Sequence, residues 1–216
     1  MRLISVNIGT ARPLVGGKPS GVSGIFKEPV AGRTFIGVLG FANDAICDKR
    51  HHGGPDQAIY VYGQPDYDWW AEQLLFPLSP GTFGENLTIA DLESGQLAIG
   101  DRLHIADAVL EVTAPRIPCV TLARRMDDKQ FLEKFRAAQR PGVYCRVIQE
   151  GAVAAGDAVR LETYAGDRVN VIDVFDEFFA SPHNEARVRR HLAAPIAIRD
   201  RENNEQYLRA MRAQPS

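Results

Sequence analysis

The chain has 216 residues, of which 45% are hydrophobic and 24% are charged. These are ordinary values for a folded domain, so they exclude a disordered, collagenous or coiled-coil protein. At roughly 150 residues per domain, the length predicts one domain with a smaller appendage. The 25 basic and 27 acidic residues leave a net charge of −2, so the chain has no global positive field that would hold a nucleic acid polymer. An anionic ligand must therefore be bound by a local basic cluster.

The three cysteines, Cys47, Cys119 and Cys145, are too few and too far apart for a disulfide framework, and the sequence contains no CxxC pair. This usage is typical of a reducing compartment. Residues 1–9 contain one basic residue and an apolar alternation that is too short for the core of a signal peptide. No apolar run approaches the ~18–20 residues that cross a bilayer. The sequence therefore predicts a cytoplasmic protein with no membrane partner.

Short segments rich in β-branched residues, separated by Gly, Pro and Asp, predict a mainly β fold for the first three quarters of the chain. Their spacing is typical of a barrel or a sandwich. Two helices interrupt the strands. Gln64–Leu74 has Pro65 in its first turn, and Lys129–Ala138 follows Asp127 or Asp128 as a cap. The expected strands are Leu3–Ile8, Gly21–Lys27, Ala58–Tyr62, Asn86–Ile89, Gln96–Ile99, Arg102–Ile105, Val109–Thr113, Gly142–Ile148 and Ala158–Glu162.

After about Tyr164 the hydrophobic period changes from two residues to about 3.6, which indicates helices. The expected helices are Val171–Phe179, Asn184–Leu192 and Glu205–Arg212, the last of them capped by Asn203 or Asn204. We therefore expect a β domain over residues 1–163 and a three-helix domain over residues 164–216. The second unit is small for independent stability, so we expect it to dock on the β domain or on a second subunit.

The densest cluster of candidate site residues is the segment 48–58, which reads Asp-Lys-Arg-His-His-Gly-Gly-Pro-Asp-Gln-Ala. Its glycines allow a ligand to approach the backbone closely and its basic residues add positive charge, so the segment fits an anion-binding loop. A hairpin turn with solvated basic residues explains the same pattern. Of the two adjacent histidines, at most one faces a site, because neighbours on an extended chain point to opposite sides. The candidates are Lys49, Arg50, His52, Gly53 and Gly54.

A second candidate lies in the loop Thr113–Leu122, where Pro115 and Pro118 bracket Arg116. The prolines rigidify the loop, so that Arg116 and Cys119 are held in fixed directions. If these two side chains converge, the guanidinium favours the thiolate, which is the form that acts as a nucleophile or as a ligand of a soft metal. The alternative is a buried and inert cysteine, which is common for a lone thiol.

Two shorter segments carry weaker signals. Lys18 in Gly-Lys-Pro-Ser-Gly is a candidate phosphate contact, and Asn86 in Phe-Gly-Glu-Asn-Leu is a candidate contact to the edge of a ligand. Each segment also fits an ordinary turn. In chain order, the stretches 17–20, 43–58, 83–87, 100–101 and 115–119, the last reading Pro-Arg-Ile-Pro-Cys, together resemble the MOSC domain. More narrowly, they resemble the small stand-alone bacterial MOSC proteins of the YiiM type.

The resemblance extends over residues 1–162, and the helical tail is similar to the 3-alpha domain that often follows in such proteins. It implies a closed β-barrel of the PK-barrel-like kind that binds molybdenum cofactor, a pterin with a dithiolene-bound molybdenum and a phosphate. Cys119 corresponds to the motif cysteine, which implies a thiolate ligand of molybdenum. The residues expected to line the cofactor are Lys18, Lys49, Arg50, His52, Gly53, Gly54, Asn86 and Arg116.

The resemblance also implies a molybdenum-dependent reductase of N-hydroxylated compounds such as hydroxylamino-purines. We expect His52 to be the proton donor, because histidine titrates near neutral pH. The sequence has no flavin or nicotinamide motif, so a separate reductase must supply the electrons. A non-catalytic carrier, in which Cys119 holds a persulfide or the cofactor for a client enzyme, explains the same residues. A homodimer is compatible with both.

The tail offers one candidate docking surface for an acidic redox partner, made of Arg187, Arg189 and Arg190. The simpler alternative is a solvated helix face, which also explains these arginines.

Overall fold

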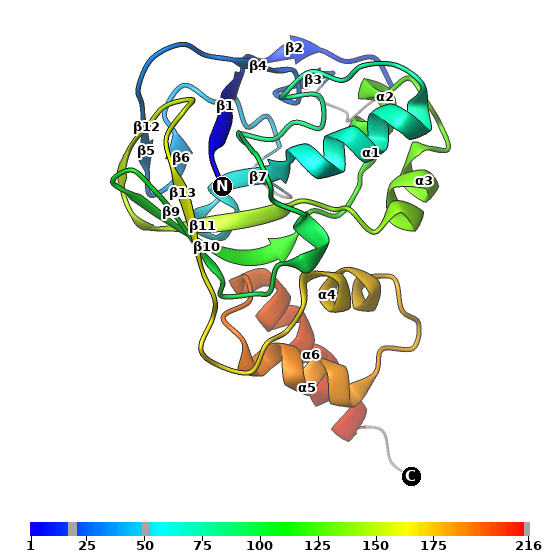
Figure 1. Cartoon of the computed structure of the whole chain (residues 1–216). Coiled ribbons are helices and arrows are strands. Elements are labelled where there is room, and N and C mark those ends of the chain that lie inside the picture. The colour runs from blue at the N-terminus through cyan, green and yellow to red at the C-terminus, as the bar shows by residue number, and fades with distance from the viewer. Residues whose placement is uncertain (17–20, 49–51, 214–216) are drawn as a thin grey trace.

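The computed structural model describes residues 1–16, 21–48 and 52–213. Its main feature is an eight-stranded sheet (Figure 1) in which every neighbouring pair is antiparallel except the parallel pair β7 and β8. The strands lie in the order β13 (Val159–Glu162), β9 (Arg102–Ile105), β10 (Ala108–Pro115), β11 (Val143–Gln149), β7 (Ile59–Gly63), β8 (Leu87–Ile89), β1 (Leu3–Gly9) and β4 (Lys27–Pro29). The smaller sheets are β12 (Gly151–Val153), β5 (Thr34–Gly37) and β6 (Gly40–Phe41), and β2 (Arg12–Pro13) with β3 (Val22–Ser23).

The large sheet curls so that its two ends approach each other. A single bridge joins Arg2 to Ala158, next to the start of β13. Leu3 N donates to Asp157 O at 2.9 Å, and Val159 N donates to Met1 O at 3.0 Å. The expected predominance of β-sheet before the C-terminal helices is confirmed, within a fold that also contains several helices. Among the described residues the strand pairing does not form the expected continuous closed barrel, because only a few bonds join the segments of β13 and β1, and β4 is a free end of the sheet.

Most of the expected strands are confirmed to within about two residues, and two are wrong in part or in whole. In the segment 21–27 only Val22–Ser23 and Lys27 join strands. The segment 96–99 forms no strand, and of its residues only Ala98 makes a bridge, to Asn170. Leu97 and Ile99 are buried in the core, so the apolar content of this segment reflects packing and not sheet pairing. The sequence also missed the short strands β2, β5, β6 and β12.

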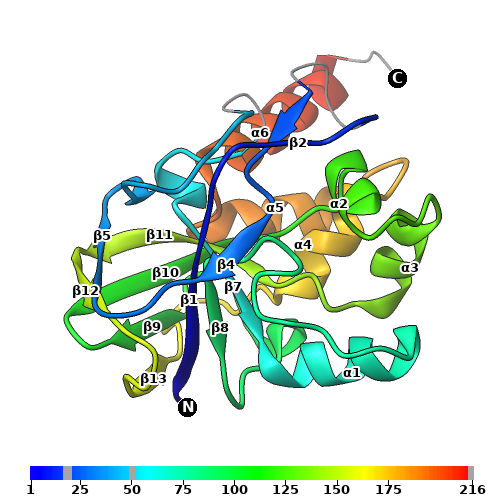
Figure 2. The same ribbon diagram turned by 90° about the horizontal axis from the view of Figure 1, so that it is seen from above.

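Three helices lie together beside the large sheet, on the side of β7 (Figure 2). Helix α1 (Gln64–Leu74) has the bounds that its Pro65 start predicts. Helix α3 (Phe131–Ala138) begins slightly later than expected, and Asp128 Oδ1 accepts a hydrogen bond from Gln130 N at 2.8 Å just before it. Helix α2 (Val120–Arg125) was not predicted, since a helix of fewer than two turns shows little periodicity in the sequence.

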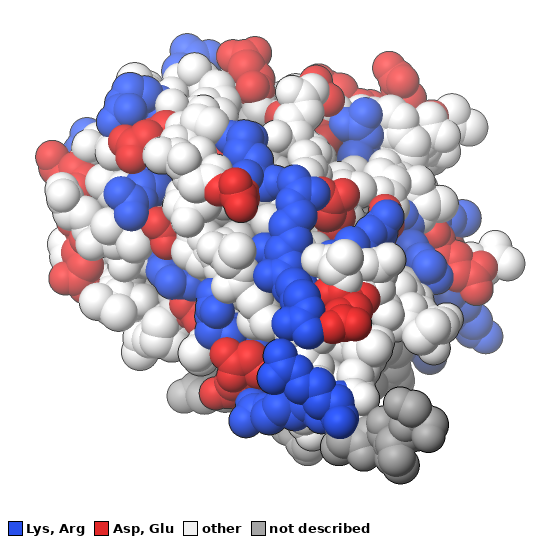
Figure 3. All heavy atoms as spheres, turned by 90° about the horizontal axis from the view of Figure 1, so that it is seen from below, with Lys and Arg blue, Asp and Glu red and all other residues white. Residues whose placement is uncertain are grey.

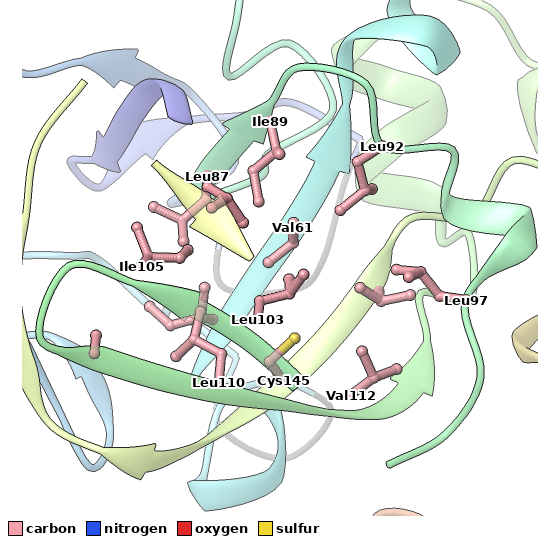
Figure 4. Close-up of a cluster of buried hydrophobic side chains, with 14 of the residues drawn as sticks. Val61, Leu87, Ile89, Leu92, Leu97, Leu103, Ile105, Leu110, Val112 and Cys145 are labelled. Carbon is pink, nitrogen blue, oxygen red and sulfur yellow. The ribbon is translucent and has the colours of Figure 1, made fainter. Parts of the chain in front are cut away.

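One of the two hydrophobic cores lies inside the curled sheet. Figure 4 shows side chains from several strands, among them Val61, Leu103 and Leu110, pointing toward one another around the sulfur of Cys145. All four of these side chains are fully buried. Burial also raises the pKa of the Cys145 thiol, so this cysteine is a packing residue, as its place in an apolar strand indicates.

The other core is aromatic and joins α1 and α3 to the sheet. The ring of Trp70 lies 5.0 Å from that of Phe131 and 6.0 Å from that of Phe135, and the Trp70 indole donates a hydrogen bond to the Tyr62 hydroxyl at 2.9 Å. Aromatic pairs at such separations stabilise a core beyond the area that they bury. This cluster holds the helices that flank the site described below.

Replacing Phe131 by Ala is expected to lower the free energy of unfolding by about 3–5 kcal/mol, because the ring is fully buried and its removal leaves a cavity. Phe76→Ala is the matched control. Its ring is 49% exposed, so the expected loss is less than about 1 kcal/mol. Urea unfolding followed by tryptophan fluorescence measures both values. Equal losses in the two variants would contradict the assignment of this core.

Three C-terminal helices, α4 (Val171–Phe178), α5 (Glu185–Ala193) and α6 (Ile198–Ala213), pack under the sheet on the side of β10 and β11 (Figure 1). Arg146 Nη2 donates to Pro195 O at 3.0 Å and to Ile196 O at 3.1 Å. The bidentate ion pair of Arg168 with the buried Asp101 adds a second link. The helical unit is thus docked on the sheet of the same chain, which is one of the two arrangements that the sequence predicts. The boundary at residues 163 and 164 stays a prediction.

The sequence placed the start of α6 seven residues too late. The helix begins at Ile198, whose backbone N–H donates to Asp56 Oδ2 at 2.7 Å. The first amides of a helix lack partners within the helix, so this carboxylate from a distant loop stabilises the helix start in place of a local cap. Helices α4 and α5 are confirmed, and Asn184 Oδ1 caps α5 by accepting from Arg187 N.

The arginines of α5 have acidic or carbonyl partners. Arg189 pairs with Glu185, Arg190 lies 3.8 Å from Asp173, and Arg187 lies 3.9 Å from Glu177. Figure 3, which views the molecule from below, shows Lys and Arg interleaved with Asp and Glu. Ion pairs of this kind are common on a solvated helix face. A docking role for these arginines stays a prediction. Among the described residues, no helix combines the length and apolarity of a membrane span.

Candidate functional site

A cavity with an empty volume of about 770 Å³, counted to its open mouth, lies between the loop after β10, the strands β7 and β11, and the N-terminal segment 22–48. We call it the first cavity. Its walls include Lys27, Asp44, His52, Gly53, Tyr60, Asn86, Arg116, Cys119 and Tyr144. The structure thus brings together residues from the basic loop, the Asn86 segment and the Pro-Arg-Ile-Pro-Cys loop.

Cys119 lies at the point where the rigid loop passes into α2. Burial by itself would raise the pKa of its thiol. A hydrogen bond from the His52 side chain, the positive charges of Arg116 and His52, and the Leu122 N–H outweigh this effect and lower the pKa to about 6. At neutral pH the residue is therefore a thiolate, which is the reactive and metal-binding form. The expected convergence of Arg116 and Cys119 is present.

Arg116 is 4% exposed and lies between two aromatic rings, with its guanidinium carbon 5.6 Å from the centre of the Tyr60 ring and 5.4 Å from that of Phe135. The guanidinium also hydrogen-bonds the Tyr144 side chain. Its Nη1 has no hydrogen-bond partner among the described residues. A buried guanidinium N–H without a partner is costly, so this atom is a donor available to an anionic group of a ligand.

His52 connects the basic loop to the thiolate. Its Nδ1 lies 3.5 Å from the Tyr144 hydroxyl, and its side chain hydrogen-bonds Cys119. The next residue, Gly53, has φ +76, and a Cβ there would lie 2.9 Å from Ile46 Cδ1. Any larger residue is therefore disfavoured at this position both by its backbone conformation and by contact. The glycine allows the loop to turn sharply after His52.

The remaining predicted site residues have different outcomes. Gly54, which has φ +84, is exposed and does not line the first cavity. Asn86 lines it, but its amide is engaged in the scaffold, since Nδ2 donates to Asp44 Oδ2 at 2.8 Å and Oδ1 accepts from Tyr60 N at 3.1 Å. Lys18, Lys49 and Arg50 lie outside the described residues. The roles of all these residues stay predictions.

Sequence reasoning missed the ion pair between Lys27 and Asp44, whose side chains are only 8% and 6% exposed. Burial lowers the pKa of Lys27, while the contact with Asp44 opposes that shift. Asp44 also accepts from Gly9 N at 2.8 Å. The available signal was a lysine that directly follows the apolar residues Ile25 and Phe26 in an expected strand. Only the fold reveals that this lysine points inward.

The described residues contain no group of three or more His, Cys, Asp and Glu side chains that would hold a metal ion by themselves. Cys47 and Cys119 both line the first cavity, and Arg116 and His52 act on the Cys119 thiol. The site thus offers one soft thiolate ligand and one unpaired cationic donor. This combination suits a metal that arrives with other ligands on an anionic carrier.

Comparison with known proteins places the chain in a defined group. A family model described as MOSC domain matches residues 48–160. The protein YiiM of Escherichia coli is 29% identical over 195 residues, which cover 88% of this chain and 85% of that protein. A Gibberella moniliformis protein named reductase is 32% identical over 143 residues, 64% of this chain but only 25% of its own length. The crystal structure of YiiM from Geobacillus stearothermophilus superposes with a TM-score of 0.80 at 24% identity, covering 96% of this chain and 98% of that one.

Proposed function

Because the chain belongs to the MOSC domain family, we propose that it is a reductase of N-hydroxylated compounds that uses molybdenum cofactor, with Cys119 as the protein ligand of molybdenum. The observation that carries this proposal is the Cys119 thiolate in the first cavity beside the buried Arg116. The relative named reductase supports a redox activity. Hydroxylamino-purines are the substrates that the resemblance implies.

The residues of the first cavity fit the cofactor. A thiolate is a ligand for a soft metal, and the unpartnered Nη1 of Arg116 is a donor for the phosphate or another anionic edge of the pterin. The first cavity is lined by apolar side chains together with a few polar and charged groups, as ligand sites commonly are. When bound, the cofactor supplies the two electrons that the reduction needs, which it receives from a separate reductase.

The chain's own residues position the thiolate and move protons. The His52 side chain, Arg116 and the Leu122 N–H together keep Cys119 deprotonated. His52 and Tyr144 lie together at the thiolate, so they are placed to deliver a proton to the leaving hydroxyl oxygen. In the overall reaction the N–O bond breaks and two electrons and two protons are consumed. One proton ends on the amine nitrogen and the other on the oxygen that leaves as water.

Turnover distinguishes this proposal from a carrier of cofactor or sulfur. Protein loaded with molybdenum cofactor is mixed with a reduced viologen dye and 6-hydroxylaminopurine, and the formation of adenine is followed by chromatography. A reductase forms adenine in catalytic amounts. A carrier forms none but transfers its cofactor or sulfur to a cofactor-free client enzyme. The second outcome, with molybdenum shown to be bound, would overturn the proposed activity.

A further inference from the structure

The start of α6 binds two segments of the chain that both lead to the candidate site. Ala197 N donates to Thr113 O at 3.1 Å, and Ile198 N donates to Asp56 Oδ2 at 2.7 Å. Thr113 lies near the end of β10, which leads into the loop with the thiolate. Asp56 lies in the 3-10 helix η1 (Pro55–Gln57), directly after the basic loop. Two consecutive amides of the helical tail are therefore bonded to the segments that supply the thiolate and its histidine.

The same two segments are also bonded to each other. The hydroxyl of the fully buried Thr113 donates to Asp56 O at 2.6 Å. Asp56 thus binds β10 through its carbonyl oxygen and α6 through its carboxylate. Three hydrogen bonds join the three segments pairwise, so displacement of any one segment breaks two of these bonds.

Strand β11 supports the segment between His52 and η1 at two points. Tyr144 and Arg146 flank the buried Cys145 in β11, so they share the other face of the strand. The Tyr144 hydroxyl lies 3.5 Å from His52 Nδ1, and Arg146 Nε lies 3.1 Å from Asp56 Oδ1. One end of the segment therefore lies against Tyr144 and the other end against Arg146.

A carboxylate suits the position of Asp56 because it has two accepting oxygen atoms. One faces the Ile198 N–H and the other faces the Arg146 guanidinium, which also binds the backbone just before α6. The Asp56 side chain is only 18% exposed, so water compensates poorly for a lost partner. An amide has one accepting oxygen in place of two, so an asparagine there cannot serve both donors.

We propose that Asp56 is a positioning residue of the candidate site, through which the start of α6 keeps His52 within hydrogen-bond distance of Cys119. The bond between His52 and the thiolate joins two loops that are far apart in the sequence, so it lasts only while both loops are held in place. The helical tail thereby contributes to the reaction through the scaffold of the site. This inference rests on the proposed reductase function for its catalytic readout but not for its hydrogen-exchange readout.

Hydrogen exchange in the full chain without cofactor is the first test. In Asp56→Asn, peptides over residues 52–58 and 196–201 are expected to exchange about tenfold faster than in the wild type, the factor that fits loss of one charge-assisted hydrogen bond. Faster exchange over 196–201 alone, with 52–58 as in the wild type, would show that the carboxylate only docks α6 and would overturn the inference.

Asp157→Asn is the matched control. The Asp157 side chain is 16% exposed, lies 3.1 Å from Arg33 Nη2 and accepts from Ala154 N at 2.8 Å. It thus makes the same two kinds of contact as Asp56, but it does not line the first cavity or bind α6. A similar loss of thermal stability is expected in both variants, with exchange over 52–58 unchanged in Asp157→Asn.

The second test measures turnover of 6-hydroxylaminopurine by protein loaded with cofactor. Asp56→Asn is expected to lower kcat at least about tenfold while KM and molybdenum content stay unchanged, because a misplaced proton donor slows the reacting step without removing a ligand contact. Asp157→Asn should keep the kcat of the wild type. An unchanged kcat in Asp56→Asn, or equal decreases in both variants, would refute the positioning role.

Thr113→Val is a second variant, which removes the hydrogen bond to Asp56 O without changing a charge. It is expected to accelerate exchange over 52–58 as well, and it provides the test if Asp56→Asn does not fold. Wild-type exchange over this segment in Thr113→Val and in any folded Asp56→Asn would contradict the inference. Wild-type protein that reduces no hydroxylamine would overturn the proposed function alone, because exchange still decides whether Asp56 holds the loop.

Discussion

Replacing Cys119 by Ala is expected to remove bound molybdenum and to lower turnover of 6-hydroxylaminopurine at least about hundredfold, because no other described thiol takes its place beside Arg116. The variant keeps its fold, since Cys119 is only half-buried and holds neither core together. Metal analysis of protein from cells that synthesise the cofactor measures the first effect, and a viologen-coupled assay measures the second.

Cys145→Ala is the matched control for this experiment. Its thiol is buried among strand side chains and does not line the first cavity, so molybdenum content and turnover should equal those of the wild type, with a stability loss of about 1 kcal/mol. Circular dichroism checks that both variants are folded. Full activity of Cys119→Ala at wild-type molybdenum content would refute the role of this thiolate.

The reactivity of Cys119 is expected to follow a low pKa. In metal-free protein, its alkylation by iodoacetamide should rise with pH, reach half of its plateau near pH 6 and level off above about pH 7, because the thiolate is the nucleophile and its pKa is about 6. A Cys47→Ala background removes the other thiol that lines the first cavity. Mass spectrometry of the peptide that contains Cys119 gives the rate at each pH.

Arg116→Met is expected to shift this profile upward by one pH unit or more. The substitution removes a buried positive charge that favours the thiolate, while the burial that favours the neutral thiol remains. Arg124→Met removes a charge elsewhere on the chain, where the guanidinium bonds Gly16 O at an exposed site, and should leave the midpoint unchanged. A wild-type midpoint near the ordinary thiol value of 9.0 would contradict the geometry of the site.

Local signals predicted the elements whose ends are determined by neighbouring residues. Pro65 starts α1, Asn184 caps α5, and the alternation of Arg102–Ile105 gives β9 with the same bounds. Where a distant partner determines an end, the local signal failed. The start of α6 depends on Asp56, which lies far away in the sequence. No local pattern near Ile198 carries that information.

The residues of the candidate site likewise fall into those that local sequence predicted and those that only the fold revealed. Residue type and order were sufficient to single out Cys119, Arg116 and His52, because a rigid loop and a glycine-rich basic loop are local features. The sequence did not predict that Lys27 points inward, nor that Tyr144 lies in the first cavity beside His52. They depend on which strands become neighbours, and that is decided by the packing of the whole sheet.

By itself, the sequence determined that the chain is a mainly β protein with a helical tail, that it belongs with MOSC proteins, and that one thiol stands out from three. Only the tertiary structure decided the chemical state of that thiol, since its pKa depends on distances to Arg116 and His52 that no spacing along the chain contains. It also decided where the tail lies, because Arg146 on β11 holds the backbone at Pro195 and Ile196 and the buried Asp101 holds Arg168. Side-chain electrostatics and cavities arise from contacts between distant segments, and such contacts form only when the chain packs.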